Sequence, residues 1–149
     1  MTRITGFRWL AVGLVAACAA VAAAPAAQAD PTGAMSTLTA VSGQGTGLVI
    51  LSPTSAGQGN FAAQFELNIH DAAPNTTFSF TRSIDRPADG VCSTDYFGNT
   101  TLTTSPGGTA TLKFEVTDGP NFAPLDLSIQ LIGSDGTVLQ SQCMTIIGK

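Results

Sequence analysis

The chain has one histidine, His70, and Asp71 follows it directly. A histidine beside an acid is the pair that activates a hydroxyl nucleophile in hydrolases, so catalysis is the first chemistry to consider. No nucleophile elbow of the form GxSxG occurs. Neighbouring residues of a strand also point to opposite faces, which separates the two side chains. The pattern favours a solvated histidine at the end of a strand, and we expect a protein that is not an enzyme.

A single histidine also excludes the copper and zinc sites that need several imidazoles. Asp85, Asp89 and Asp95 share one connection and could offer oxygen ligands to calcium, but their spacing matches no calcium-loop motif. Glu66 and Glu115 are expected on exposed strand faces without a cleft, which disfavours glycoside hydrolysis. We therefore expect no cofactor, with calcium as a weak alternative.

Two cysteines, Cys92 and Cys143, remain once a leader peptide is removed. An exported protein meets oxidising conditions, so we expect these cysteines to be paired. Metal ligation is disfavoured because there is no CxxC spacing and no local histidine. Closing a loop of about 51 residues would stabilise the fold by about 4 kcal/mol on the chain-entropy model.

The most informative irregular stretch runs from residue 84 to residue 99 and contains Cys92. It also holds Arg86, Tyr96 and Phe97, which are residue types favoured in contact surfaces. Long ordered loops of small domains tend to carry function. This stretch is therefore the candidate binding loop. The alternative is that Tyr96 and Phe97 cap the open end of the core while the disulfide pins the loop for stability.

Residues 1–29 have the layout of a secretory signal peptide, with two arginines, an apolar run and an AQA cleavage site before Asp30. A second interpretation treats the stretch VAAC ending at Cys18 as a lipobox, whose cysteine would carry a lipid and provide the only membrane contact. Either route takes the protein out of the cytoplasm. We expect a secreted, extracellular or cell-envelope protein with one domain over residues 30–149.

Removal of the leader lowers the net charge, because all the acidic residues lie after it. Four basic and ten acidic side chains remain, giving 4 − 10 = −6. The basic residues do not cluster, whereas contacts to nucleic-acid phosphates need grouped lysines and arginines. We expect no nucleic-acid partner.

The elements that would position these residues show a strict alternation of apolar and polar side chains, the period of a half-buried strand. It is clearest in residues 61–69, 78–84, 110–116 and 125–131. Further strands are expected at residues 35–41, 47–51, around Leu102 and at 138–147. Because single-faced sheets must bury that face against one another, we predict an all-β, antiparallel β-sandwich of about seven or eight strands. A small β-barrel is the alternative.

The stretches PNTTFSF, DGVC and GGTATLKFEV resemble the immunoglobulin-like or fibronectin-like sandwich domains of bacterial secreted proteins. The resemblance implies the general sandwich form. The chain after the leader lacks the tryptophan that packs on the disulfide in immunoglobulin domains. Fold does not determine function. We expect a non-catalytic extracellular binding or structural module, whose partner is an extracellular protein or a cell-surface polymer. An extracellular protease inhibitor presenting the loop from Asp85 to Phe97 is the alternative, and a small enzyme is less expected.

Overall fold

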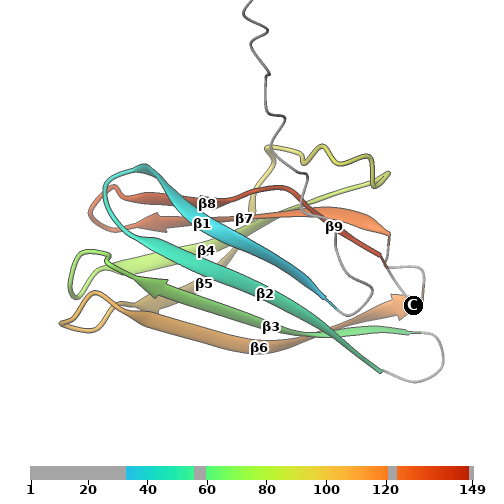
Figure 1. Ribbon diagram of the computed structural model, residues 1–149, viewed down its shortest axis with the longest axis horizontal. Coiled ribbons are helices and arrows are strands. Elements are labelled where there is room, and N and C mark those ends of the chain that lie inside the picture. The colour runs from blue at the N-terminus through green and yellow to red at the C-terminus, as the bar shows by residue number, and fades with distance from the viewer. Residues whose placement is uncertain (1–32, 56–59, 121–123, 148–149) are drawn as a thin grey trace, which may run out of the picture.

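The computed structural model describes residues 33–55, 60–120 and 124–147 of the chain (Figure 1). The expected signal peptide and Cys18 lie outside these residues. The described part of the chain folds into nine strands and contains no helix. The strands are β1 (Ala34–Ser42), β2 (Thr46–Ser55), β3 (Asn60–His70), β4 (Thr77–Asp85), β5 (Phe97–Thr103), β6 (Ala110–Pro120), β7 (Leu125–Gly133), β8 (Val138–Ser141) and β9 (Met144–Ile146).

The strands form one antiparallel sheet in the order β5-β4-β7-β8-β1-β2-β3-β6, with β9 also paired to β7. In Figure 1 the strands β2, β3 and β6 lie below β7 and β8, and β1 pairs with a strand of each group. The sheet therefore curls into a nearly closed barrel. Its seam lies between β5 and β6, the two ends of the hydrogen-bonded path. The predicted all-β antiparallel fold is confirmed, and the barrel alternative describes it more closely because the path of strands is continuous.

The barrel interior is filled by the apolar faces that the alternation predicts. Three phenylalanines from three strands meet there: Phe65 of β3 stacks on Phe114 of β6 with ring centroids 4.7 Å apart. Phe80 of β4 meets these two rings edge-on, at centroid distances of 5.2 and 5.9 Å. Each large side chain buried in this way stabilises the fold by about 1.5–3 kcal/mol. The aromatic contacts join the two layers across the interior.

The last predicted strand, residues 138–147, is in fact two strands, β8 and β9. The interruption falls at Gln142 and Cys143, where side-chain hydroxyls replace the partners of the backbone ladder. Ser141 Oγ accepts a hydrogen bond from the Ile129 N–H at 2.9 Å, and Ser36 Oγ accepts one from the Gln142 N–H at 3.0 Å. Because these backbone groups are satisfied, the chain can leave the sheet at Cys143 without leaving buried donors unpaired.

The polar face predicted for β7 is buried rather than exposed. Asp126 and Ser128 alternate with apolar residues as expected, yet both are almost inaccessible to solvent. On β4, Ser83 is equally buried. The reason is the loop between β4 and β5, which lies over the outer face of these two strands and bonds to them. The sheet is therefore covered on both sides at this place.

Candidate functional site

The candidate binding loop leaves the sheet after Asp85, at the end of β4, and rejoins it at Phe97, at the start of β5. Figure 1 shows it rising above one end of the barrel. Four kinds of contact hold it against the sheet: a disulfide, a buried carboxylate, a tyrosine hydroxyl and a serine hydroxyl. They come from different strands and fix the part of the loop from Gly90 to Tyr96.

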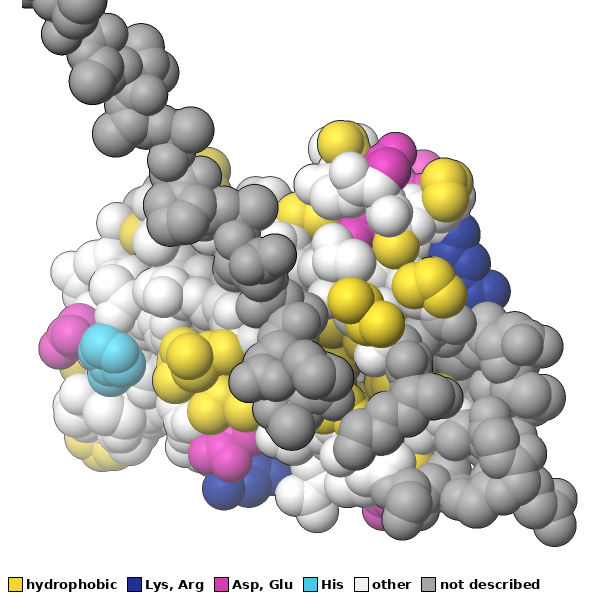
Figure 2. Space-filling view, turned by 45° about the vertical axis from the view of Figure 1, so that its right-hand side comes forward, with side chains coloured by type: hydrophobic (Ala, Val, Ile, Leu, Met, Phe, Trp, Pro, Cys, Tyr) yellow, Lys and Arg dark blue, Asp and Glu magenta, His cyan; other side chains and the backbone are white. Residues whose placement is uncertain are grey.

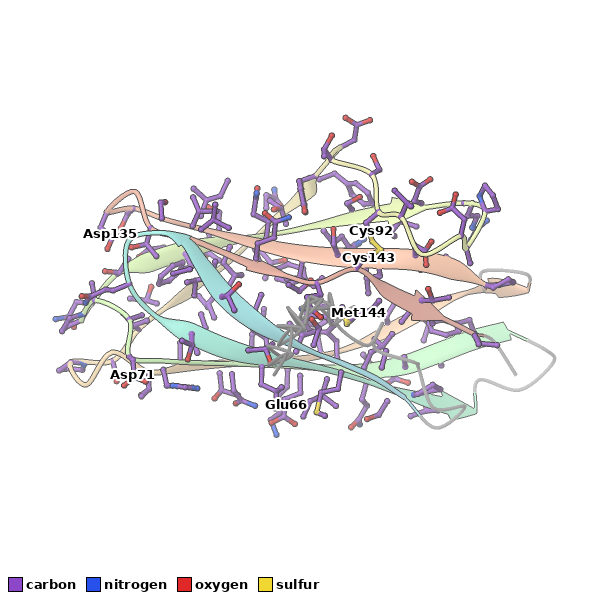
Figure 3. The ribbon with its side chains drawn as sticks, turned by 45° about the horizontal axis from the view of Figure 1, so that its top comes forward. Glu66, Asp71, Cys92, Asp135, Cys143 and Met144 are labelled. Atoms are coloured by element: carbon purple, nitrogen blue, oxygen red, sulfur yellow. A yellow bond between two sulfur atoms is a disulfide. The ribbon has the colours of Figure 1, made fainter. Side chains whose placement is uncertain are left out.

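The disulfide joins Cys92 of the loop to Cys143 between β8 and β9. The Sγ–Sγ distance is 2.14 Å and the Cα atoms are 5.5 Å apart. Figure 3 shows this bond between the loop and the sheet. The predicted pairing of the two cysteines is present in the structure. It ties the middle of the loop to the point where the last predicted strand is interrupted.

The buried carboxylate belongs to Asp126 of β7. Its Oδ2 accepts a hydrogen bond from the Gly90 N–H at 2.7 Å, and its Oδ1 accepts one from the Thr145 hydroxyl at 2.6 Å. A charge without contact to water is costly to bury unless it is hydrogen-bonded, and here both oxygens are used. Gly90 has a φ of +84°, the left-handed region that favours glycine. This backbone turn directs its N–H toward the carboxylate.

Two hydroxyl groups complete the attachment. The Tyr96 hydroxyl accepts hydrogen bonds from Gln140 Nε2 at 2.8 Å and from Ser128 Oγ at 3.0 Å. Ser83 Oγ donates to the carbonyl oxygen of Ser93 at 2.7 Å. Tyr96 is thus half-buried against the outer faces of β7 and β8. It anchors the loop, and it caps no open end of the core.

The side chains that the loop region presents to solvent include Val91 and Phe97, with 66% and 48% of their surfaces exposed. Arg86 is exposed as well. At the upper right of Figure 2, where the loop lies, hydrophobic side chains stand next to acidic and basic ones. The guanidinium of Arg82 lies over the ring of Phe97 in a cation–π contact, with its Cζ 5.0 Å from the ring centroid. Of the three predicted contact residues, Arg86 and Phe97 are accessible and Tyr96 is engaged internally.

The three predicted calcium candidates shape turns in this loop. Asp85 Oδ1 accepts from the Arg86 N–H at 2.7 Å, and Asp89 Oδ1 accepts from the Val91 N–H at 2.9 Å. The Asp95 N–H donates to a serine hydroxyl at 3.0 Å. Among residues 33–55, 60–120 and 124–147 no group of three or more His, Cys, Asp or Glu side chains could hold a metal ion. The structure does not gather these three acids into a site.

His70 lies at the turn end of β3, and the expectation that Asp71 points away from it is wrong. Asp71 has a φ of +57°, which ends the strand and brings its Oδ2 within 2.8 Å of His70 Nδ1. The hydroxyl of Thr46 lies 3.2 Å from both ring nitrogens. A hydroxyl oxygen at the same distance from both ring nitrogens cannot lie along the lone pair of either nitrogen. The His70 ring is therefore poorly placed to accept the proton of the Thr46 hydroxyl.

The surroundings of this trio are those of a surface turn. The side chains of His70 and Asp71 are 56% and 82% exposed. Figure 3 shows Asp71 near one end of the molecule, away from the disulfide. Catalytic sites stabilise developing charge with preorganised dipoles in an environment from which water is excluded. Dipoles that are exposed to water stabilise such charge only weakly. The geometry supports hydrogen bonding at a turn.

A shallow hollow of about 250 Å³ lies on the outer face of β2, β3 and β6, and its lining includes Glu66, Glu115 and Lys113. Lys113 Nζ is 2.8 Å from Glu66 Oε2, and Asn68 Nδ2 donates to Oε1 at 3.0 Å. The lysine, and to a lesser degree the asparagine, hold the pKa of Glu66 below its ordinary value. A glycosidase acid needs a raised pKa, so this environment opposes that role.

Comparisons of the chain with protein-family models, with curated proteins and with solved structures give no match. In the part of the chain that the structure describes, we find no helix with the length and hydropathy needed to cross a membrane. The function therefore has to be inferred from the chemistry of the chain itself.

The sequence interpretation did not single out Asp126 or Arg82, two residues of the site region. Asp126 occupies an ordinary polar position of β7, and no local signal shows that a loop will bury it. Arg82 does carry a signal: it shares the inward-facing register of Phe80 and Ile84 on β4. A cation among residues that face the core indicates either a strand end or a site.

Proposed function

We propose that the protein is a secreted or cell-envelope, non-catalytic binding module that contacts its partner through the pinned loop, the segment from Asp85 to Phe97. The observation that carries this proposal is the combination of firm attachment and exposed contact side chains in one segment. The loop is held by Cys92, by the Gly90 N–H and by Tyr96, while Val91 and Phe97 face solvent.

Rigidity of the loop supports binding for an energetic reason. Ordering a flexible segment at an interface costs about 0.5–1.5 kcal/mol for each immobilised side chain with many rotamers. Ordering the backbone of a flexible loop adds a further cost, which a loop with a fixed backbone largely avoids. Aromatic residues and arginine contribute most to contact surfaces, and Phe97 and Arg86 are of these types. The partner is an extracellular protein or a cell-surface polymer.

The acidic character of the chain narrows the class of partner. With the leader removed the formal charge is −6, from four basic and ten acidic residues. The exposed acids of the loop, Asp89 and Asp95, add negative charge beside the hydrophobic contact residues. Such a surface repels polyanions and favours a neutral or basic partner.

Capture from the cell envelope and culture fluid of the producing organism tests the proposal. The purified protein is immobilised, and retained species are quantified by mass spectrometry. The double variant Val91→Ala, Phe97→Ala should lose a captured species. A matched control is Val41→Ala, Ile132→Ala, because these side chains are 66% and 44% exposed and lie on other strands. Equal capture by both double variants, or hydrolytic activity that depends on His70, would overturn the proposal.

A second candidate, an extracellular protease inhibitor, is favoured by the position of Val91. It stands exposed between two anchors, the Gly90 N–H on the Asp126 carboxylate and the disulfide at Cys92. A protease that cleaves after small aliphatic residues could bind such a segment. Inhibition of a panel of secreted proteases at micromolar protein, abolished by Val91→Asp and retained in Val41→Asp, would support it. The absence of inhibition across the panel would exclude it.

A further inference from the structure

The barrel interior contains an apolar cavity at the end nearest the pinned loop. Its volume is about 160 Å³, and residues of β2, β3, β4, β6, β7 and β9 line it. The lining is hydrophobic apart from Arg82 and Thr117. The phenylalanine cluster of Phe65, Phe80 and Phe114 forms part of its wall. Space of this kind is unusual in a protein interior, which is normally packed without voids larger than a water molecule.

The cavity lies where the barrel is least closed. β5 pairs with β4 only as far as the Arg82–Phe97 pair, so within the described residues Ile84 has no partner on that edge. On the other side of the seam, Val116 and Thr117 of β6 line the same cavity. Arg82 therefore lines the cavity at the place where the pairing of β4 with β5 ends.

The size and polarity of the cavity indicate what could fill it. An engineered protein cavity of about 150 Å³ with a similar aliphatic and aromatic lining stays dry and binds benzene. The present cavity is of that size, so it suits a phenyl ring or a chain of about six carbon atoms. Water would find few hydrogen-bond partners there, because a stable buried water needs two to four polar neighbours.

Arg82 gives this cavity a charged rim. Its side chain is half-buried and stands in the inward-facing register of β4. In the part of the chain that the structure describes it forms no ion pair with a carboxylate, and its contact is with the face of the Phe97 ring. A partly desolvated guanidinium is most stable opposite a planar anion, and a carboxylate matches its fork of N–H donors.

From these observations we propose that the cavity binds a small apolar monocarboxylate, an aromatic or short-chain aliphatic acid. Its hydrocarbon body would lie among Phe65, Phe80 and Phe114, and its carboxylate would accept hydrogen bonds from the Arg82 guanidinium. The site adjoins the pinned loop through the contact between Arg82 and Phe97, but it does not depend on a partner binding to the loop surface. Among the residues that line the cavity, Arg82 is the cation, and its guanidinium supplies the attraction for a carboxylate.

The test is an NMR titration of the full chain with hexanoate and with 3-phenylpropanoate, followed through the methyl signals of Ile84, Leu127 and Ile146, which line the cavity. The neutral analogue 1-hexanol is titrated in parallel. The carboxylates should shift these signals and leave that of Leu139, buried elsewhere in the core, unchanged. The two acids show whether an aromatic or an aliphatic body is preferred. Absence of shifts with both acids, or equal affinity for 1-hexanol, would overturn the proposal.

Variants separate the two parts of the site. Arg82→Met should weaken carboxylate binding by about 10- to 100-fold, the range for a lost charged hydrogen bond, and leave 1-hexanol within about threefold. Lys113→Met removes a cation from the outer face and should change neither. Val116→Phe fills the cavity without removing the guanidinium and should abolish binding of both ligand types. Carboxylate affinity that is unchanged by Arg82→Met, or carboxylate binding that survives Val116→Phe, would refute the assigned site.

Discussion

Removing the disulfide by the double substitution Cys92→Ala, Cys143→Ala should lower the stability of the protein by a calculable amount. The bond closes a loop across a sequence separation of 51 residues. In the chain-entropy model this closure restricts the unfolded chain by about 4 kcal/mol at 25 °C. A domain of this size is stable by about 5–15 kcal/mol, so the variant should still fold.

The same loss can be expressed as a change in melting temperature. Unfolding entropy is about 2.1 cal/mol/K per residue, which for a domain of about 120 residues gives about 0.25 kcal/mol for each degree. A loss of about 4 kcal/mol therefore corresponds to a drop of about 16 °C. Thermal unfolding followed by circular dichroism measures this, and intact mass first checks that the parent protein lacks the two thiol hydrogens.

The folded loop should survive this change, because its other anchors do not depend on the disulfide. Asp126 still accepts from the Gly90 N–H, and Tyr96 still accepts from Gln140. The double variant should therefore lose stability mainly through its unfolded state. A drop of less than about 5 °C would refute the entropic reasoning, given the expected slope of about 0.25 kcal/mol per degree. Complete loss of the folded state would refute the claim that the other anchors suffice.

Three further outcomes are expected from single substitutions. Thr145→Val keeps the side-chain shape but removes one of the two hydrogen bonds to the buried carboxylate of Asp126. Urea unfolding should therefore show a free energy of unfolding that is lower by about 1.5–3 kcal/mol. An unchanged free energy of unfolding would mean that the carboxylate is solvated. Gly90→Ala should lower the free energy of unfolding by about 1–2 kcal/mol, because alanine is strained at its left-handed φ. No steric clash adds to this, since no atom lies within 4 Å of the added Cβ. The control Gly107→Ala should lower the free energy of unfolding less, because Gly107 does not have a positive φ. The pKa of Glu66 is lowered in the folded state by its lysine partner, so its contribution to stability is present above pH 4.5 and is lost as the pH falls through the folded pKa. Glu66→Gln should remove that part of the acid dependence, and an unchanged acid profile would contradict the assigned ion pair.

The alternation of side chains was sufficient to predict the strands, because a half-buried strand repeats every second residue. The faces of β3 and β4 follow it, with Phe65, Leu67, Phe78 and Phe80 inside. The pattern could not decide between two stacked sheets and one curled sheet. Both arrangements bury the same strand faces. They differ in whether β1 forms backbone hydrogen bonds with both β2 and β8.

The parts of the site that could not be predicted depend on contacts between segments far apart in the sequence. The sequence pattern predicts Asp126 as a surface residue. In the structure it is covered by the pinned loop, whose Gly90 lies 36 positions earlier in the chain. Asp71 meets His70 only because its backbone leaves the strand conformation. The pairing of Cys92 with Cys143 was predictable by contrast, because these two cysteines remain after the expected leader and pairing is the common use of cysteines in chains that are expected to be exported.

Amide hydrogen exchange at Gly90 tests most directly whether the loop is pinned to the sheet. Its N–H donates to a carboxylate that is fully buried, although the glycine itself is exposed on the surface of the loop. If the loop is held as described, this amide should exchange at least about tenfold more slowly than an unprotected one, which corresponds to about 1.4 kcal/mol of opening free energy. Exchange at the rate of an unstructured peptide would show that the loop is free, and would contradict both the anchoring and the preorganised surface.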